Sequence, residues 1–68
     1  MEEEIERIES RAKTALANYY YEEFMYTLTK EYPDESNKRH ILMYLAQKAI
    51  EYSNGDETIA KAIKIHKL

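Results

Sequence analysis

The sequence contains a single proline and a single glycine, and these two residues divide its 68 positions into three segments without a strong helix breaker. Proline disfavours the helical conformation of the residue before it, so we expect Pro33 to close a first helix over residues 2–32. The pair at 54–55, Asn-Gly, supplies a left-handed stop for a second helix that ends near Ser53. The positions of these two helix breakers therefore predict an all-α fold whose first helix is unusually long.

Short polar residues stand where the later helices begin. Asp34 or Ser36 can cap the second helix, because their side chains can accept hydrogen bonds from the free N–H groups of the first turn. Asp56 can cap a third helix over residues 57–67 in the same way. No segment shows the alternation of a strand. We therefore predict a single domain over residues 1–68, built as a three-helix bundle.

One alternative concerns the continuity of the long first segment. If the chain broke near Asn18 and folded back, the result would be a compact four-helix domain. The tripeptide Ala17-Asn18-Tyr19 contains neither glycine nor proline, the residues that break helices most strongly. A continuous helix is therefore the favoured interpretation.

Charge and composition argue against several classes of partner. The formal net charge is −3, and a surface for nucleic acid or anionic membrane needs a concentrated basic patch. No apolar run approaches the roughly 20 residues that span a bilayer. The N-terminus, Met1-Glu2-Glu3-Glu4, lacks the basic segment of a signal peptide. We expect a soluble, intracellular or recombinant protein whose fold owes nothing to disulfides, since it has no cysteine.

Two apolar stripes run along nearly opposite sides of the first helix. Both follow the alternating three- and four-residue spacing that faces a neighbouring helix. The first stripe consists of Ile5, Ile8, Ala12, Ala15, Tyr19 and Tyr26, with Glu22 interrupting it. The second stripe consists of Ala17, Tyr21, Phe24, Met25, Leu28 and Tyr32. One helix therefore has apolar surface for two neighbours, and the spacing leaves open which stripe faces the core.

The second helix is too short to cover the first. At 1.5 Å per residue it reaches back only about 27 Å from the turn, which places its end opposite about Thr14. The first three turns of the first helix therefore extend beyond it. A structural self-assembler is one hypothesis, in which Ile5, Ile8 and Ala12 pair with a second copy in an antiparallel dimer.

The aromatic run around Tyr19-Tyr20-Tyr21 supports another hypothesis, a protein-binding module. Tyrosine covers a large area at low entropic cost and is enriched at binding surfaces, and three consecutive positions cannot all enter one core. The alternative is that the run packs inside with one ring at the rim. The predicted partner-binding residues are Tyr20, Tyr21, Phe24, Met25 and Leu28, with His40, Met43 and Tyr44 as contributors.

Nothing in the sequence groups into a catalytic, cofactor or metal site. The serines lack a nucleophile-elbow context, and the single glycine is accounted for as a helix stop. His40 and His66 show no His-x-x-x-His or Glu-x-x-His spacing, and a zinc site would need two further ligands. We therefore expect no enzymatic activity, no cofactor, no metal and no small-molecule substrate.

Over its full length the chain resembles a de novo designed helical mini-protein of the binder type. The resemblance is one of style and rests on the acidic start, Met1 to Ile5, the caps at 32–36 and 54–57, and a lysine-bearing last helix without Cys or Trp anywhere. Threonines and the tyrosine run depart from the residues that designs favour on helices. The resemblance implies that a partner selected those residues. A natural helical protein is the alternative.

Overall fold

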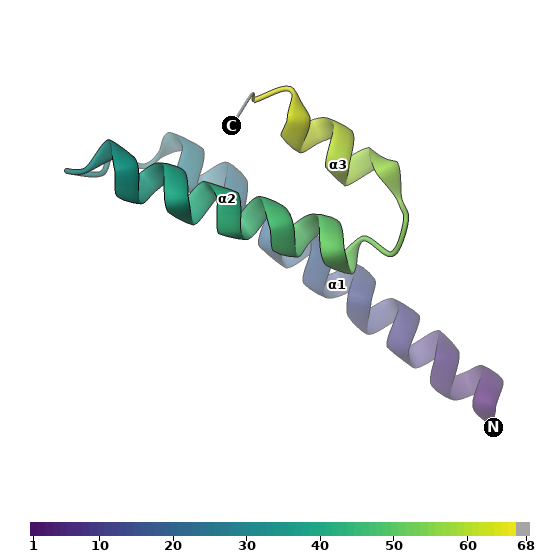
Figure 1. Ribbon diagram of the computed structural model, residues 1–68. Helices are drawn as coiled ribbons and strands as arrows, with labels where there is room; N and C mark the ends of the chain where they lie inside the picture. The colour runs from purple at the N-terminus through teal and green to yellow at the C-terminus, as the bar shows by residue number, and fades with distance from the viewer. Residues whose placement is uncertain (67–68) are drawn as a thin grey trace.

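The computed structural model describes residues 1–66 and contains three α-helices and no strand in that part of the chain, namely α1 (Glu2–Thr29), α2 (Glu35–Tyr52) and α3 (Glu57–Lys64) (Figure 1). This confirms the all-α prediction of a three-helix architecture with a long first helix. The four-helix alternative is wrong, because α1 continues through Asn18 without interruption.

The end of α1 differs from the prediction. The helix stops at Thr29, before Tyr32, because Lys30 leaves the helical region with φ −82° and ψ 137°. The last turn of α1 carries no basic residue of its own. Instead, the Lys38 ammonium group of α2 donates a hydrogen bond of 3.1 Å to the carbonyl oxygen of Leu28. A cation from the next helix thus takes the place that favours positive charge at a helix C-terminus.

The two predicted turns have the expected chemistry. Of the two candidate caps for α2, Asp34 is the one used, and its carboxylate accepts a hydrogen bond of 2.9 Å from the backbone N–H of Ser36. Asp56 caps α3 by accepting one of 2.9 Å from Thr58. Asn54 and Gly55 both lie in the left-handed region, at φ 55° and 88°. The sequence predicted that α3 continues to residue 67, but the helix ends at Lys64, so the prediction is wrong at Ile65. Position 67 itself lies outside the described residues.

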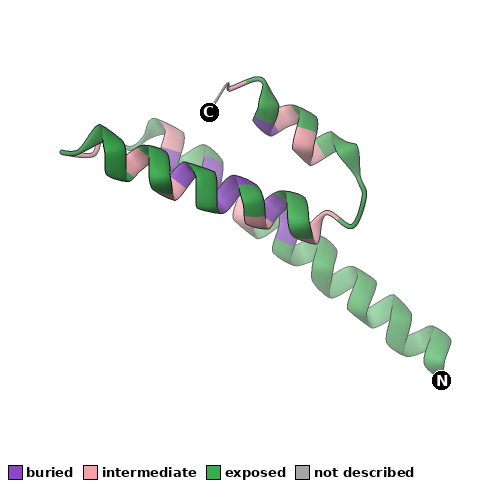
Figure 2. Cartoon of the chain, viewed as in Figure 1, coloured by how far each residue is buried: buried purple, intermediate pink, exposed green. Residues whose placement is uncertain are grey.

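The core lies between the C-terminal half of α1 and one face of α2, with α3 closing one side. Phe24 is fully buried at its centre, and Ile63 is the residue through which α3 enters the core. His66, after α3, places its ring edge-on to Phe24 with centroids 5.7 Å apart. Figure 2 shows the buried positions confined to these segments, while the N-terminal half of α1 is exposed throughout. The buried core residues are Phe24, Leu42, Leu45, Ala46, Ala49 and Ile63.

A free helical segment gives the molecule its elongated shape. Every residue from 1 to 16 is exposed, and Ala17 is the first buried one. We call residues 2–16 the overhang; at 1.5 Å per residue it is about 22 Å long. The chain measures 50 × 19 × 15 Å and its radius of gyration is 13.9 Å, against about 11 Å for a typical domain of this length.

The overhang is longer than the sequence predicted. Tyr52, the last residue of α2, stacks on Tyr20, so α2 ends opposite Tyr20 instead of near Thr14. The cause lies in the connection at the other end. Because Lys30 is extended, the chain runs past the end of α1 before α2 begins (Figure 1), and α2 then reaches less far back.

Candidate functional site

The first stripe of α1 is an extensive apolar feature that no other helix covers. The structure turns the second stripe inward and leaves all six members of the first exposed. Ile5 and Ile8 in the overhang are 50% and 58% exposed. Tyr19 and Tyr26, on the side of the bundle away from α2, are 56% and 58% exposed. The stripe is therefore exposed at every one of its apolar positions from Ile5 to Tyr26, and Glu22 is the charge that interrupts it.

The total accessible surface is large for a monomer. The chain exposes 5572 Å² at a mass of 8.1 kDa, whereas folded monomers of that mass expose about 4,500 Å². The surplus of about 1,100 Å² is close to the roughly 800 Å² that each partner contributes to a stable protein interface. The accessible surface of the molecule thus exceeds the value expected for its mass by about the area that one protein interface buries on each partner.

Charges within the overhang do little to hold it. Its one ion pair joins Arg7 to Glu4 at 3.9 Å, and the two side chains are 69% and 67% exposed. Exposed pairs of this kind contribute between 0 and about 1 kcal/mol because water screens them. The helical order of the overhang must therefore depend on helix propensity, on its connection to the bundle, or on a contact with another molecule.

Four of the predicted partner-binding residues belong to the chain's own core. Phe24 is fully buried, and Tyr20, Tyr21 and Leu28 are half-buried and pack against the core. α2 already occupies the face that these four residues form, and a partner contact at their exposed parts stays a prediction. Met25 differs from them, since it is 36% exposed at the edge of that face.

The half-buried Tyr20 sits in an aromatic cluster. Its ring stacks on Tyr52 and meets Tyr44 edge-on, with centroids 6.5 Å apart for the second pair. Burial, followed by the neighbouring phenols of Tyr44 and Tyr52, raises the pKa of Tyr20 above its ordinary value of 10.0. Next to this cluster, the carboxylate of Glu51 at 3.6 Å raises the pKa of Lys48. The cluster fixes where α2 ends on α1.

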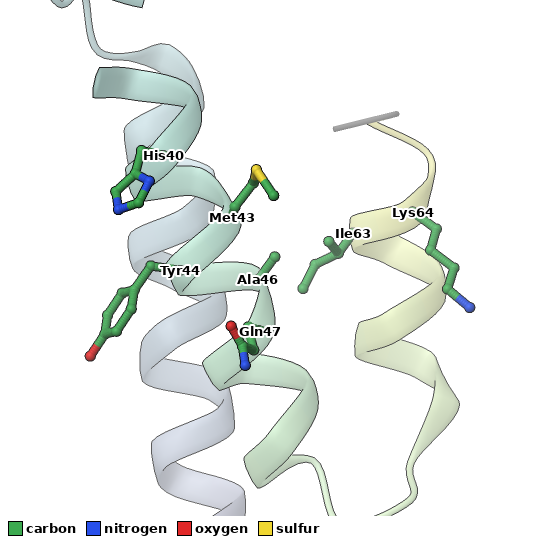
Figure 3. Close-up of a pocket in the computed structure, with 7 residues that line it drawn as sticks. All are labelled: His40, Met43, Tyr44, Ala46, Gln47, Ile63 and Lys64. Atoms are coloured by element: carbon green, nitrogen blue, oxygen red, sulfur yellow. The ribbon is translucent and has the colours of Figure 1, made fainter. Parts of the chain in front are cut away.

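The other predicted contributors, His40, Met43 and Tyr44, come together on the outer surface of α2. They line an open groove of about 600 Å³ between α2 and α3. Figure 3 shows Met43 and Ala46 pointing toward Ile63, whereas His40 and Tyr44 point away from α3 and Lys64 away from α2. The floor of the groove is therefore apolar and its rims are polar. The full lining consists of His40, Met43, Tyr44, Ala46, Gln47, Ile63 and Lys64.

Sequence reasoning missed the α3 side of this groove. Ile63 belongs to an apolar row on α3 with Ile59, so a contact with α2 was foreseeable. The angle at which α3 rests on α2 was not, because it depends on side-chain packing that spacing does not encode. Ala46 is the other omission; its small side chain leaves the space that Met43 and Ile63 border.

Residues 1–66 contain neither a metal-binding cluster nor a helix suited to cross a membrane. That part of the chain holds no group of three or more His, Cys, Asp or Glu placed to bind a metal ion. None of its helices combines the length and the apolar character needed to cross a bilayer. Comparisons with protein-family models, with curated proteins and with solved structures find no significant match to this chain.

Proposed function

We propose that the chain is a non-enzymatic, self-associating helical module whose contact surface is the first stripe of α1. The observation that carries this proposal is the continuous exposure of that stripe along a helix that extends about 22 Å beyond its own bundle. Exposed apolar residues at alternating three- and four-residue spacing form the seam of helix pairs. The surplus surface is of the size that one protein interface requires.

The energetics of the overhang support the same conclusion. A helical stretch of about 15 residues without side-chain packing is marginal in water even where the packed half of α1 supplies the nucleus, because each added residue contributes little. The overhang has fifteen residues, and all of them are exposed. A neighbouring helix on Ile5 and Ile8 would remove apolar surface from water and stabilise the helical state by about 25 cal/mol for each Å² covered.

The experiment compares two charge insertions in the overhang. Ile5→Glu combined with Ile8→Glu places charges in the stripe, whereas Ser10→Glu places one on the opposite side of the same helix. Sedimentation equilibrium between 10 µM and 1 mM should show a dimer for the wild type and for Ser10→Glu, and a monomer for the double variant. A wild type that remains monomeric throughout this range would falsify the proposal.

A second candidate function is recognition of another protein through the groove between α2 and α3. The observation that favours it is the apolar floor formed by Met43, Ala46 and Ile63, bordered by polar groups. A groove of this form suits the apolar face of an amphipathic helix. Displayed helical peptides would be selected against the wild type and counter-screened against Met43→Glu. Peptides that bind only the wild type would support this function, and failure to select any would contradict it.

A further inference from the structure

The charges beside the first stripe bear on how a second helix can lie on it. Residues 2–9 hold five glutamates and one arginine, whereas the rest of the overhang holds Arg11 and Lys13. The next cation along α1 is Lys30, directly after its last residue, and its ammonium group lies 5.9 Å from the centre of the Tyr26 ring. The acidic end of α1 and its basic positions are thus separated along the helix.

A parallel pair of α1 helices would bring like charges together. With the stripes in register, Glu22 would face Glu22 of the second copy inside the seam. Glu4 on one flank would face Glu9 of the other helix, since parallel pairs join flanking positions five residues apart. The five acidic side chains of each overhang would also gather at one end. Like charges placed in this way are destabilising.

An antiparallel pair removes these conflicts and matches the side chains by size. If Ala12 of one copy lies against Ala15 of the other, the two helices can approach closely at small residues. Ile8 of each copy then contacts Tyr19 of the other, so the two-fold symmetry gives this contact twice, once on each side of the alanines. Glu22 falls opposite Ile5 near the edge of the contact, where its carboxylate reaches water. The acidic first turn ends beside Tyr26, where Lys30 supplies a positive charge.

The bundle leaves room for this arrangement. Tyr19 and Tyr26 lie on the side of α1 away from α2, and both are more than half exposed. A second helix can therefore continue from the overhang onto the back of the bundle without meeting α2. The pairing covers about 18 residues of each α1, which agrees with the surplus surface of the single chain.

We propose that the occupant of the first stripe is a second copy of this chain, lying antiparallel with Ala12 against Ala15 and Ile8 against Tyr19. This inference rests on the proposed function and adds the orientation and register to it. In the resulting dimer, residues 17–22 of each α1 lie between α2 of their own chain and α1 of the second copy, whereas the overhang lies against the second copy alone. The first stripe is then covered from Ile5 to Tyr19.

A double-mutant cycle on dimer dissociation tests the register. Ile8 and Tyr19 are about 16 Å apart along one α1, so within a single chain their substitutions should act independently. Across an antiparallel interface they touch. We expect Ile8→Ala and Tyr19→Ala each to raise the dissociation constant of the dimer about tenfold. In the double variant the dissociation constant should rise by at least about fivefold less than the product of the two single effects. Ile8→Ala with Tyr26→Ala is the control pair, for which the effects should multiply.

Spin labels give the orientation independently. The chain has no cysteine, so Glu31→Cys offers a single labelling site just after α1. An antiparallel dimer places the two labels about 45–55 Å apart, and a parallel dimer places them within about 25 Å. A dimer with the short distance, or with multiplying effects at Ile8 and Tyr19, overturns this inference and leaves the proposed function standing. A wild type that stays monomeric overturns both.

Discussion

Tyr20 of α1 and Tyr52 of α2 stack with their ring centroids 5.8 Å apart and their planes 6° from parallel. Tyr52 is the last residue of α2, so this contact marks the point on α1 beyond which no other helix follows it. On one side of the stack lies the bundle, and on the other lies the overhang.

Alkaline pH should weaken the fold through Tyr20. Its pKa is raised in the folded state, so its contribution to stability is complete below pH 10.0, the ordinary value, and is lost as pH rises through the raised pKa. The stability of Tyr20→Phe should therefore fall less steeply between pH 9 and 11. Thermal melts followed by circular dichroism at a series of pH values measure this. Equal slopes for the wild type and Tyr20→Phe would contradict the prediction.

Adjacent residues of α1 should differ sharply in their effect on stability. Phe24 is fully buried and Met25 is 36% exposed. Phe24→Ala should cost about 3–5 kcal/mol, because it removes a large buried side chain and leaves a cavity. That is comparable to the whole stability of a domain this small. Met25→Ala should stay within about 1 kcal/mol, as measured by urea denaturation. A large loss at Met25 would show that it packs more deeply than described.

The hydrogen bond from Lys38 to Leu28 should hold the end of α1. Lys38→Met keeps the aliphatic stem and removes the ammonium group, which leaves the Leu28 carbonyl to water. We expect a loss of about 1 kcal/mol and faster amide exchange in the last turn of α1. Arg39→Met, at the next and exposed position, is the matched control. If both substitutions have the same effect, general charge and not this hydrogen bond is responsible.

Acid should loosen α3 through its cap. The hydrogen bond from the backbone N–H of Thr58 lowers the pKa of Asp56 below its ordinary value of 3.8. The stabilising effect is therefore present above pH 3.8 and is lost as pH falls through the lowered pKa. The Thr58 amide resonance should titrate with a midpoint below 3.8. In Asp56→Asn, which keeps an acceptor oxygen, that titration should disappear; its persistence would assign it to another group.

Local chemistry was sufficient to predict most of the helical framework. Asp56, Asn54 and Gly55 each act through their own backbone or the next turn, so their roles follow from residue type and spacing. The continuity of α1 through Asn18 followed from the absence of a breaker. The end of α1 at Thr29 did not follow, because the hydrogen bond that stabilises it comes from Lys38, nine residues further along the chain.

Periodicity over the whole of α1 does not show which of its two stripes faces inward, because only part of the helix lies beside α2. Only residues 17–29 of α1 face α2. Over that half, the first stripe offers two tyrosines separated by Glu22, whereas the second offers Ala17, Phe24 and Leu28. Weighing only the half within reach of α2 would have favoured the second stripe. The groove beside α3 was harder to predict from the sequence, since its shape depends on how Ile63 packs against Ala46.

One consequence of the overhang concerns cooperativity. α1 is a single helix by geometry, but we expect its two halves to unfold separately, because the buried residues of α1 begin at Ala17. In a dilute sample, amides of residues 2–16 should exchange as a frayed helix does, while those around Phe24 exchange only when the core opens. Loss of helical signal and loss of tyrosine packing would then follow separate transitions, and their separation would narrow as the concentration is raised.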